Sequence, residues 1–174
     1  MDLWQGDTAT NSMRRAFANM TNLTSVPAAV TDLSGVFNNA TSFNGDVSGW
    51  NTAAVSFMSG AFEGATSFNQ PVPWNTRNNT GFAAMFKGAT SFDQPVAFDS
   101  RNVFDFTGMF EGATAFNSPV TLDITAAEGM ANMFRGATRF NQNLSGWNVA
   151  GVYEFQNFRT GSALTDANTP VKFR

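Results

Sequence analysis

The sequence predicts an α/β solenoid in which about seven turns of 24 residues stack side by side. The first observation is a motif that the chain rewrites at a fixed interval, as Met85–Phe92, Met109–Phe116 and Met133–Phe140. The second is that further apolar residues recur in register between these motifs. We therefore expect a parallel β-sheet on one face and short helical or 3-10 segments on the other.

Two columns of mostly aromatic residues run through the repeats. The first column consists of Phe17, Phe37, Phe62, Phe86, Phe110, Phe134 and Phe158. The second column lies six residues later and holds Leu23, Phe43, Phe68, Phe92, Phe116, Phe140 and Leu164. A single turn of this length cannot bury its apolar face alone, so we expect both columns to form the core between turns.

A β-strand is expected in each turn, because two further apolar columns lie two residues apart in the middle repeats. In Val72-Pro73-Trp74 this alternation sends both outer side chains to one face, which predicts that the tryptophan points inward. The strands should centre near Val26, Val47, Val72, Val96, Val120, Leu144 and Val171. An extra Ser-Gly after Val47 and after Leu144 predicts a bulge in those two strands.

A short helical segment is expected after each strand, where the apolar period changes. Val103, Phe106, Met109 and Phe110 stand at i, i+3, i+6 and i+7, which is the spacing of one buried stripe. The glycine of each Gly-Ala-Thr should end the segment, because glycine tolerates the left-handed conformation of a C-cap.

The chain is predicted to form a single repeat domain over residues 1–174. Residues 1–35 should be atypical, capping repeats, residues 36–160 the regular repeats, and residues 161–174 a polar loop with a last strand. No apolar run approaches the ~20 residues that a membrane-spanning helix needs. We expect no membrane insertion, and expect any secretion signal or anchor to lie outside this sequence.

The composition argues against several classes of function. The chain has 10 basic and 13 acidic residues and a net charge of −3, whereas a nucleic-acid-binding domain usually carries a basic stripe. It has no His and no Cys, which removes the commonest general base and the thiolate nucleophile. We therefore predict neither nucleic-acid binding nor an enzyme.

The repeat Met-Phe-x-Gly-Ala-Thr-x-Phe-Asn-Gln-x-Val-x-Trp-Asn-Thr, best seen across Met85–Phe92 and Phe68–Thr76, resembles the BspA-like leucine-rich repeat family of surface proteins. The closest branch is the DUF285 repeat of bacteria. The resemblance covers about residues 12–160 and implies a leucine-rich-repeat-like, right-handed solenoid. It also implies cell-surface adhesion or protein binding, and it supplies no catalytic residue.

Three polar columns allow a functional and a structural interpretation. Asp99 and Asp123 occupy equivalent positions and could share a Ca²⁺ ion, or each could bond the backbone of its own turn. The threonine of Gly-Ala-Thr could form an ice-binding rank, or its hydroxyl could bond the neighbouring turn. The residues after the first Phe column alternate in sign, which predicts surface ion pairs: Glu63, Lys87, Glu111, Arg135 and Arg159. The structural interpretation is favoured for all three columns, and no cofactor is expected beyond the weak Ca²⁺ candidate.

The outward sheet positions and the turn after the strand remain as the candidate binding surface. Its proposed ligand contacts are Asn75, Arg77, Asp99, Arg101 and Asp123. We expect an extracellular adhesion module that binds a protein, peptide or glycan of another cell or host surface non-covalently. It should be a monomeric part of a larger multidomain surface chain. The alternatives are an ice- or mineral-binding solenoid and a purely structural spacer.

Overall fold

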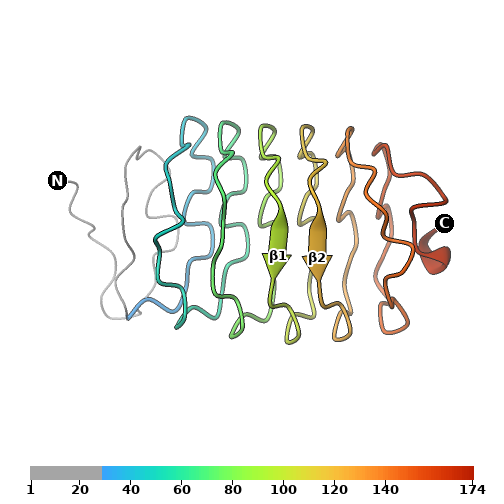
Figure 1. Cartoon of the computed structure of the whole chain (residues 1–174), viewed down its shortest axis with the longest axis horizontal. Coiled ribbons are helices and arrows are strands. Elements are labelled where there is room, and N and C mark those ends of the chain that lie inside the picture. Colours follow the sequence, from blue (N-terminus) through green and yellow to red (C-terminus); the bar gives the residue numbers. More distant parts are fainter. Residues whose placement is uncertain (1–28) are drawn as a thin grey trace.

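In a computed structural model, residues 29–174 wind into turns that lie side by side along one axis (Figure 1). The structure describes these residues alone. The strand expected near Val26 and most of the expected capping repeats at 1–35 lie outside the described residues. Within residues 29–174, no helix has the length and apolarity that crossing a membrane would take.

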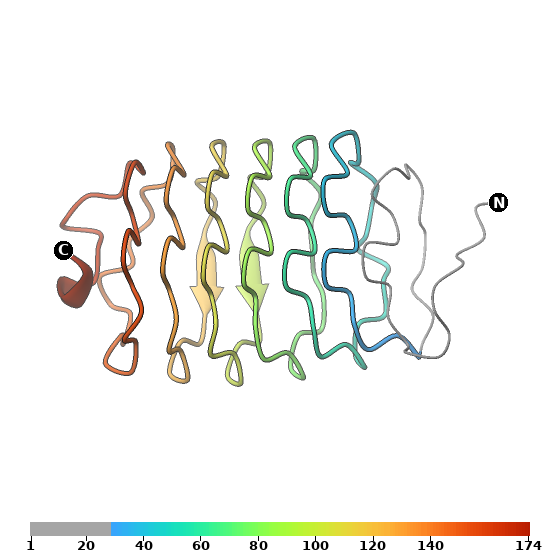
Figure 2. The ribbon, with the colours of Figure 1, turned by 180° about the vertical axis from the view of Figure 1, so that it is seen from behind.

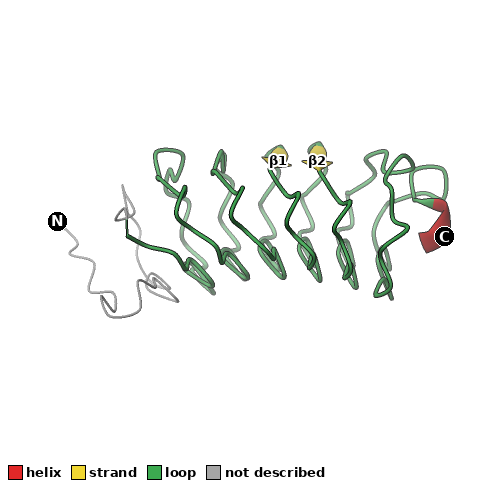
Figure 3. Cartoon of the chain, turned by 90° about the horizontal axis from the view of Figure 1, so that it is seen from below, coloured by secondary structure: helices red, strands yellow, loops and turns green. Residues whose placement is uncertain are grey.

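The sheet face carries two regular strands, β1 (Val96–Phe98) and β2 (Val120–Leu122). They pair in parallel, with Val96 opposite Val120 and Phe98 opposite Leu122. In the view along the strands from below, β1 and β2 lie next to each other on the same face (Figure 3). The parallel strands predicted near Val96 and Val120 are therefore confirmed.

The strands predicted near Val47, Val72 and Leu144 are not formed as regular elements. Val72 lies between two prolines, which have no N–H group to donate to a ladder. The bulges predicted after Val47 and Leu144 are tight turns, closed by the N–H groups of Trp50 and Trp147 at 3.2 and 3.0 Å. The extra Ser-Gly thus turns the chain instead of bulging a strand.

The last strand, predicted near Val171, is a 3-10 helix, η1 (Val171–Phe173). The N–H of Phe173 donates to the carbonyl of Pro170 at 2.9 Å, which closes the turn. The ring of Phe173 then packs on Phe155 and Phe158, with centroids 4.8 and 4.7 Å apart. Burial of Phe173 over the end of the stack explains why the chain turns here.

The face opposite the sheet, which we call the back face, has no helix in the described repeats; each segment there zigzags through consecutive β-turns (Figure 2). The N–H of Met85 donates to the carbonyl of Phe82 and that of Ala89 donates to Phe86, both at 3.1 Å. The alternate N–H groups donate to the next turn of the stack, as Phe86 does to the carbonyl of Met109 at 2.9 Å. Tandem turns of this kind also place apolar residues at i, i+3 and i+4, so the predicted helical segments were wrong although their buried residues were right.

Positive φ angles recur at the third residue of these turns. Gly88 has φ 68° and its equivalents Gly64, Gly112 and Gly136 have φ 71°, 70° and 70°. A β-turn with positive φ at this position is of the type that favours glycine or asparagine. The glycine of Gly-Ala-Thr is therefore required by a β-turn of the back face, and not by a helix C-cap.

Ala84 is the third residue of the β-turn that precedes the one with Gly88, and its φ is 55°. The equivalent residues of other repeats, Gly60, Gly108 and Asn132, have φ 63°, 62° and 58°. Left-handed backbone costs an alanine about 1–2 kcal/mol, and glycine avoids this cost. We expect Ala84→Gly to raise the free energy of unfolding by about 0.5–1 kcal/mol, because part of the gain is lost to the greater freedom of the unfolded chain.

The neighbouring Ala83 provides the control, since its φ is not positive. Ala83→Gly should destabilise the protein by about 0.5–1 kcal/mol. Urea unfolding of both variants measures the difference. Equal destabilisation by the two substitutions would contradict this account of the turn.

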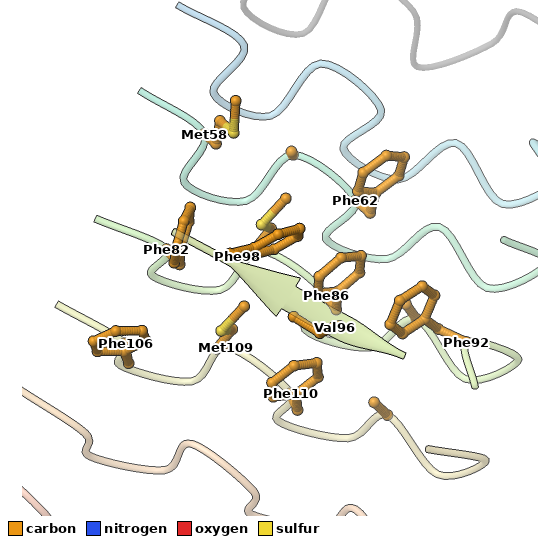
Figure 4. Close-up of a cluster of buried hydrophobic side chains, with 14 of the residues drawn as sticks. Met58, Phe62, Phe82, Phe86, Phe92, Val96, Phe98, Phe106, Met109 and Phe110 are labelled. Carbon is orange, nitrogen blue, oxygen red and sulfur yellow. The ribbon is translucent and has the colours of Figure 1, made fainter. Parts of the chain in front are cut away.

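The core is a stack of rings between the two faces (Figure 4). Phe110 is fully buried, and its ring lies parallel to Phe86 and Phe134 with centroids 5.6 and 5.4 Å apart. It also stacks on Phe116 of the second column at 4.2 Å. Both predicted columns thus form the core from Phe37 to Phe140.

The tryptophans lie on the inner side of the sheet face, as predicted. Trp50 and Trp74 are buried and stack with centroids 5.5 Å apart. Trp147 is half-buried and packs against the core. The indole N–H of Trp74 donates to the carbonyl of Val47 at 3.0 Å, so its polar atom is satisfied inside the stack.

The last described turn departs from the predicted register by one residue. The N–H of Phe134 donates to the carbonyl of Phe158, whereas that of Phe110 donates to Met133. Phe158 therefore occupies the methionine column, and its ring meets Phe134 edge-on, at 82°. The extra residue explains why the first aromatic column does not continue past Phe134.

Candidate functional site

The turn that follows each strand, which we call the exit turn, holds all five residues proposed as ligand contacts. Asn75, Arg77, Arg101 and Asp123 are exposed, and Asp99 is half-buried. The Nε of Arg101 lies 2.8 Å from Oδ1 of Asp99. The structure thus brings the predicted residues together along one edge of the stack.

Positive and negative side chains lie next to each other along the exit turns. The hydrogen bond from Arg101 holds the pKa of Asp99 below its usual value, and the more distant charge of Arg77 acts in the same direction. In return, Asp99 raises the pKa of Arg101, with a smaller contribution from Asp123. The repulsion between the two stacked arginines is therefore offset mainly by Asp99, with a smaller contribution from Asp123.

The Asx residues bond their own turns, which is the structural interpretation favoured above. Oδ1 of Asn75 accepts the N–H of Arg77 at 3.3 Å. Oδ1 of Asp123 accepts both the hydroxyl and the N–H of Thr125, at 2.6 and 3.0 Å, and these bonds lower the pKa of Asp123. In the described part of the chain no three acidic residues gather in a way that could hold a metal ion.

Hydroxyl groups behind the exit turn connect successive turns. Thr52 and Thr76 are buried, and their hydroxyls donate to the carbonyls of Asn75 and Asp99, each at 3.1 Å. Ser100 repeats the contact to Asp123 at 2.8 Å. These hydrogen bonds fix the position of each exit turn relative to the next. In the sequence, the threonines that directly follow Asn51 and Asn75 indicate the contact.

The threonines of Gly-Ala-Thr are engaged in the same way on the opposite edge. The hydroxyl of Thr66 donates to the carbonyl of Thr41 at 3.1 Å, and Thr90, Thr114 and Thr138 each donate to the preceding turn at 3.3, 3.4 and 3.3 Å. The hydroxyl protons of this column therefore point along the stack. The predicted bonding to the neighbouring turn is confirmed.

The predicted charge column on the back face forms ion pairs around Glu111. Lys87 and Arg135 approach its two carboxylate oxygens at 3.2 and 3.1 Å. Glu63 is bonded by the side-chain amide of Asn38 at 3.0 Å. The prediction was wrong for Arg159, because the extra residue of the last turn puts Thr160 in this column: the N–H of Gly136 donates to Thr160, where that of Gly112 donates to Arg135. Arg159 lies outside the column and pairs with Asp166. This column is thus occupied by contacts within the chain.

In the middle repeats the outward side chains of the sheet face are small and mostly apolar. Pro73 and Ala97 are exposed between inward-facing neighbours, and the same holds for the equivalent outward positions Pro71, Pro95, Pro119 and Thr121. The result is a flat surface bordered by the exit turn. Arg77 is the arginine of that border with no carboxylate within ion-pair distance in the described residues.

Sequence reasoning missed a second surface, on the back face next to the exit turn. Phe57, Phe104 and Tyr153 are 54%, 49% and 65% exposed, although residues of this size are usually covered. Acidic residues adjoin them, and Glu128 accepts the hydroxyl of Tyr153 at 2.9 Å. The position of Phe104 holds Thr80 in the turn before it, and that of Phe57 holds Gly81 in the turn after it, so no aromatic column predicted them.

The family described as "Mycoplasma protein of unknown function, DUF285" matches residues 10–120 and residues 73–170. The chain belongs to the DUF285 family. The two matched stretches overlap, which is expected where the repeats are alike. No match to the chain was found among curated proteins or among solved structures.

The DUF285 motif can be interpreted through the structure of this member. Its phenylalanines form the stacked core, its glycine supplies the positive φ of a back-face β-turn, and its threonine bonds the preceding turn. The repeated positions thus maintain the stack. The residues that differ between repeats, including the exposed aromatics and the exit-turn arginines, are the ones left for recognition.

Proposed function

We propose that this DUF285 protein is an extracellular, non-catalytic binding module with a leucine-rich-repeat-like, right-handed solenoid fold of the BspA-like type. It would bind a protein, peptide or glycan on another cell or host surface through the sheet face. The observation that carries the proposal is the flat sheet surface bordered by Arg77, whose guanidinium has no carboxylate partner in the described residues. Parallel hydrogen-bonded turns support a rigid surface, and a rigid surface loses little entropy on binding.

The chemistry of the exit turn suits polar ligands. Arg77 offers a planar set of donors that matches a carboxylate or a pair of sugar hydroxyls. Its neighbour Asn75 is exposed and uses Oδ1 within the turn, which leaves its amide N–H groups for a ligand. Arg101 is already paired with Asp99, so we assign it a supporting role: its charge keeps Asp99 from pairing fully with Arg77.

The test is attachment of the whole chain to glycan and peptide arrays, followed by titration of each hit. We expect Arg77→Ala with Arg101→Ala to weaken binding at least about tenfold while the melting temperature changes little, because both side chains are exposed. The matched control is Arg139→Ala, which removes an exposed arginine from the opposite edge. If Arg139→Ala weakens binding equally, the loss comes from the change in net charge, and this result would contradict a site on the sheet face.

The other two functions predict different results. A spacer would bind nothing on the arrays. An ice-binding protein would show thermal hysteresis, but the threonine hydroxyls already donate to neighbouring carbonyls, and this favours the binding module. Binding that survives the double substitution would move the site to another surface of the stack.

A further inference from the structure

We propose a second docking surface on the back face, independent of the sheet-face site, for an extended basic segment of a partner protein. Its centre, which we call the acidic aromatic face, consists of Phe104, Asp105, Glu128, Tyr153 and Glu154. These residues line a hollow of about 210 Å³ together with Thr107 and Gly129. No lysine or arginine lines it.

The three carboxylates of this face have no cation within ion-pair distance in the described part of the chain. Asp99, Glu111 and Asp166 each pair with an arginine or lysine, whereas Asp105, Glu128 and Glu154 have no ion pair within the described residues. Three carboxylates without an ion pair give this part of the surface a negative potential, which attracts positively charged groups. Their complement is a positively charged side chain with an apolar stem.

Glycine at position 129 opens the hollow. A Cβ atom there would lie 3.3 Å from Oδ1 of Asp105, 3.9 Å from Oε2 of Glu154 and 3.2 Å from the hydroxyl of Thr107. Two carboxylate oxygens and a hydroxyl therefore converge on one point beside the backbone. An ammonium or guanidinium group near this point would meet both charges.

The aromatic rings provide the second half of a cation site. The N–H of Glu128 donates to the carbonyl of Phe104 at 2.9 Å, and that of Tyr153 donates to Glu128 at 3.0 Å, so the three residues stand in one column. A cation near Glu128 would be flanked by both rings, whose faces attract positive charge. The hydrogen bond to Glu128 raises the pKa of Tyr153.

The molecule already uses this kind of contact at its C-terminal end. Nζ of Lys172 lies 5.8 Å from the centroid of the Phe155 ring and donates to the carbonyls of Val149, Ala150 and Val152. A lysine over an aromatic ring at the end of a turn is thus compatible with the backbone of these repeats. The acidic aromatic face offers a similar ring together with carboxylates.

The spacing of the aromatics points to an extended segment instead of a single amine. Phe104 and Tyr153 lie two turns apart in one column, and turns paired in parallel are ~4.8 Å apart, which places these two residues ~10 Å from each other. Phe57 lies one position further along its own turn, in the column that contains Gly81 and Asp105. In a polyproline II helix every third residue returns to the same side after ~9 Å. A segment with lysine or arginine at every third residue would therefore place one cation at Phe104 and one at Tyr153.

Fluorescence anisotropy of the whole chain with labelled peptides tests the proposal. The probe contains four Lys-Pro-Pro triplets, and two controls contain four Glu-Pro-Pro triplets or the same lysines and prolines in two blocks. We expect the triplet lysine peptide to bind and the glutamate peptide not to bind. The block peptide should bind at least about threefold more weakly, because it cannot reach successive aromatics.

Variants of the protein separate this surface from general attraction to a negatively charged chain. We expect Phe104→Ser with Tyr153→Ser to weaken the triplet peptide at least about fivefold, and Glu154→Gln about two- to fivefold. Asp46→Asn is the matched control, because it removes one exposed carboxylate from the sheet side of the repeat and retains the oxygen that accepts the N–H of Ser48. Its effect should be below about twofold.

Three results would overturn the proposal. They are no binding of the triplet peptide, equal binding of the block peptide with no effect of the aromatic substitutions, and self-association of the parent chain that Phe104→Ser abolishes. The last result, measured by sedimentation, would make a second copy of this chain the occupant of the face. Arg77→Ala should leave peptide binding unchanged, so this test and that of the sheet face can fail separately.

Discussion

Phe110→Ala is expected to lower the free energy of unfolding by about 3–5 kcal/mol, the range for removing a buried phenylalanine. The Phe110 ring is fully buried and lies parallel to three others, from its own turn and from both neighbouring turns. Rings above and below are fixed by backbone hydrogen bonds between turns, so the stack cannot close over the cavity. Urea unfolding of the variant and the parent measures the loss.

The adjacent Glu111→Ala is the control, and it should cost under about 1 kcal/mol because its ion pairs lie at the surface. Hydrogen exchange adds a spatial test. In a stack where each repeat contacts only its neighbours, Phe110→Ala should lower the protection of amides in the turns of Phe86 and Phe134 more than in the turn of Phe43. Similar unfolding midpoints for the two variants would contradict the central place of Phe110.

The sequence was sufficient to locate the core because each core column contains the same or a similar apolar residue in successive repeats. Phe86, Phe110 and Phe134 are identical residues at one interval, and equivalent residues of parallel turns must stack. The parallel pairing of β1 and β2 follows from the same periodicity. The last turn has one extra residue, which the spacing of 24 between Phe134 and Phe158 concealed. Phe158 was therefore assigned to the first aromatic column, although it lies in the methionine column.

Local backbone conformation was harder to predict because two structures share one apolar pattern. Tandem β-turns and a short helix both bury Phe106, Met109 and Phe110. What separates them is the positive φ at Gly108 and Gly112, four residues apart, which a helix does not allow. The position of Gly108 holds glycine or asparagine in most repeats, and this pattern could have indicated a β-turn. Ala84 at the same position obscured the pattern.

The candidate surfaces were predictable to different degrees. Arg77 and Arg101 lie at equivalent positions, so their proximity to Asp99 and Asp123 followed from the repeat. In the turns before Phe104 and before Tyr153, the equivalent positions hold Thr80 and Glu128. Binding surfaces of a repeat protein lie where the repeats differ, and periodicity alone does not reveal them.

Asn79 is the one residue in the described core whose side-chain polar atoms are buried without a partner. It is fully buried, and neither Nδ2 nor Oδ1 has a hydrogen-bond partner. The equivalent positions in the neighbouring turns hold Val55 and Val103, both fully buried. An unsatisfied buried amide costs about 1–3 kcal/mol, so Asn79 weakens a column that is otherwise apolar.

Asn79→Val is therefore expected to raise the free energy of unfolding by about 1–3 kcal/mol. Valine fits this backbone, because the N–H groups of Val55, Asn79 and Val103 all donate to the carbonyl three residues before them at 2.9 Å. The control is Asn78→Val, which removes an exposed amide that donates to the carbonyl of Ala53 at 2.8 Å and should be neutral or mildly destabilising. Urea unfolding measures both variants, and a loss of stability in Asn79→Val would show that the amide of Asn79 has a partner inside the stack.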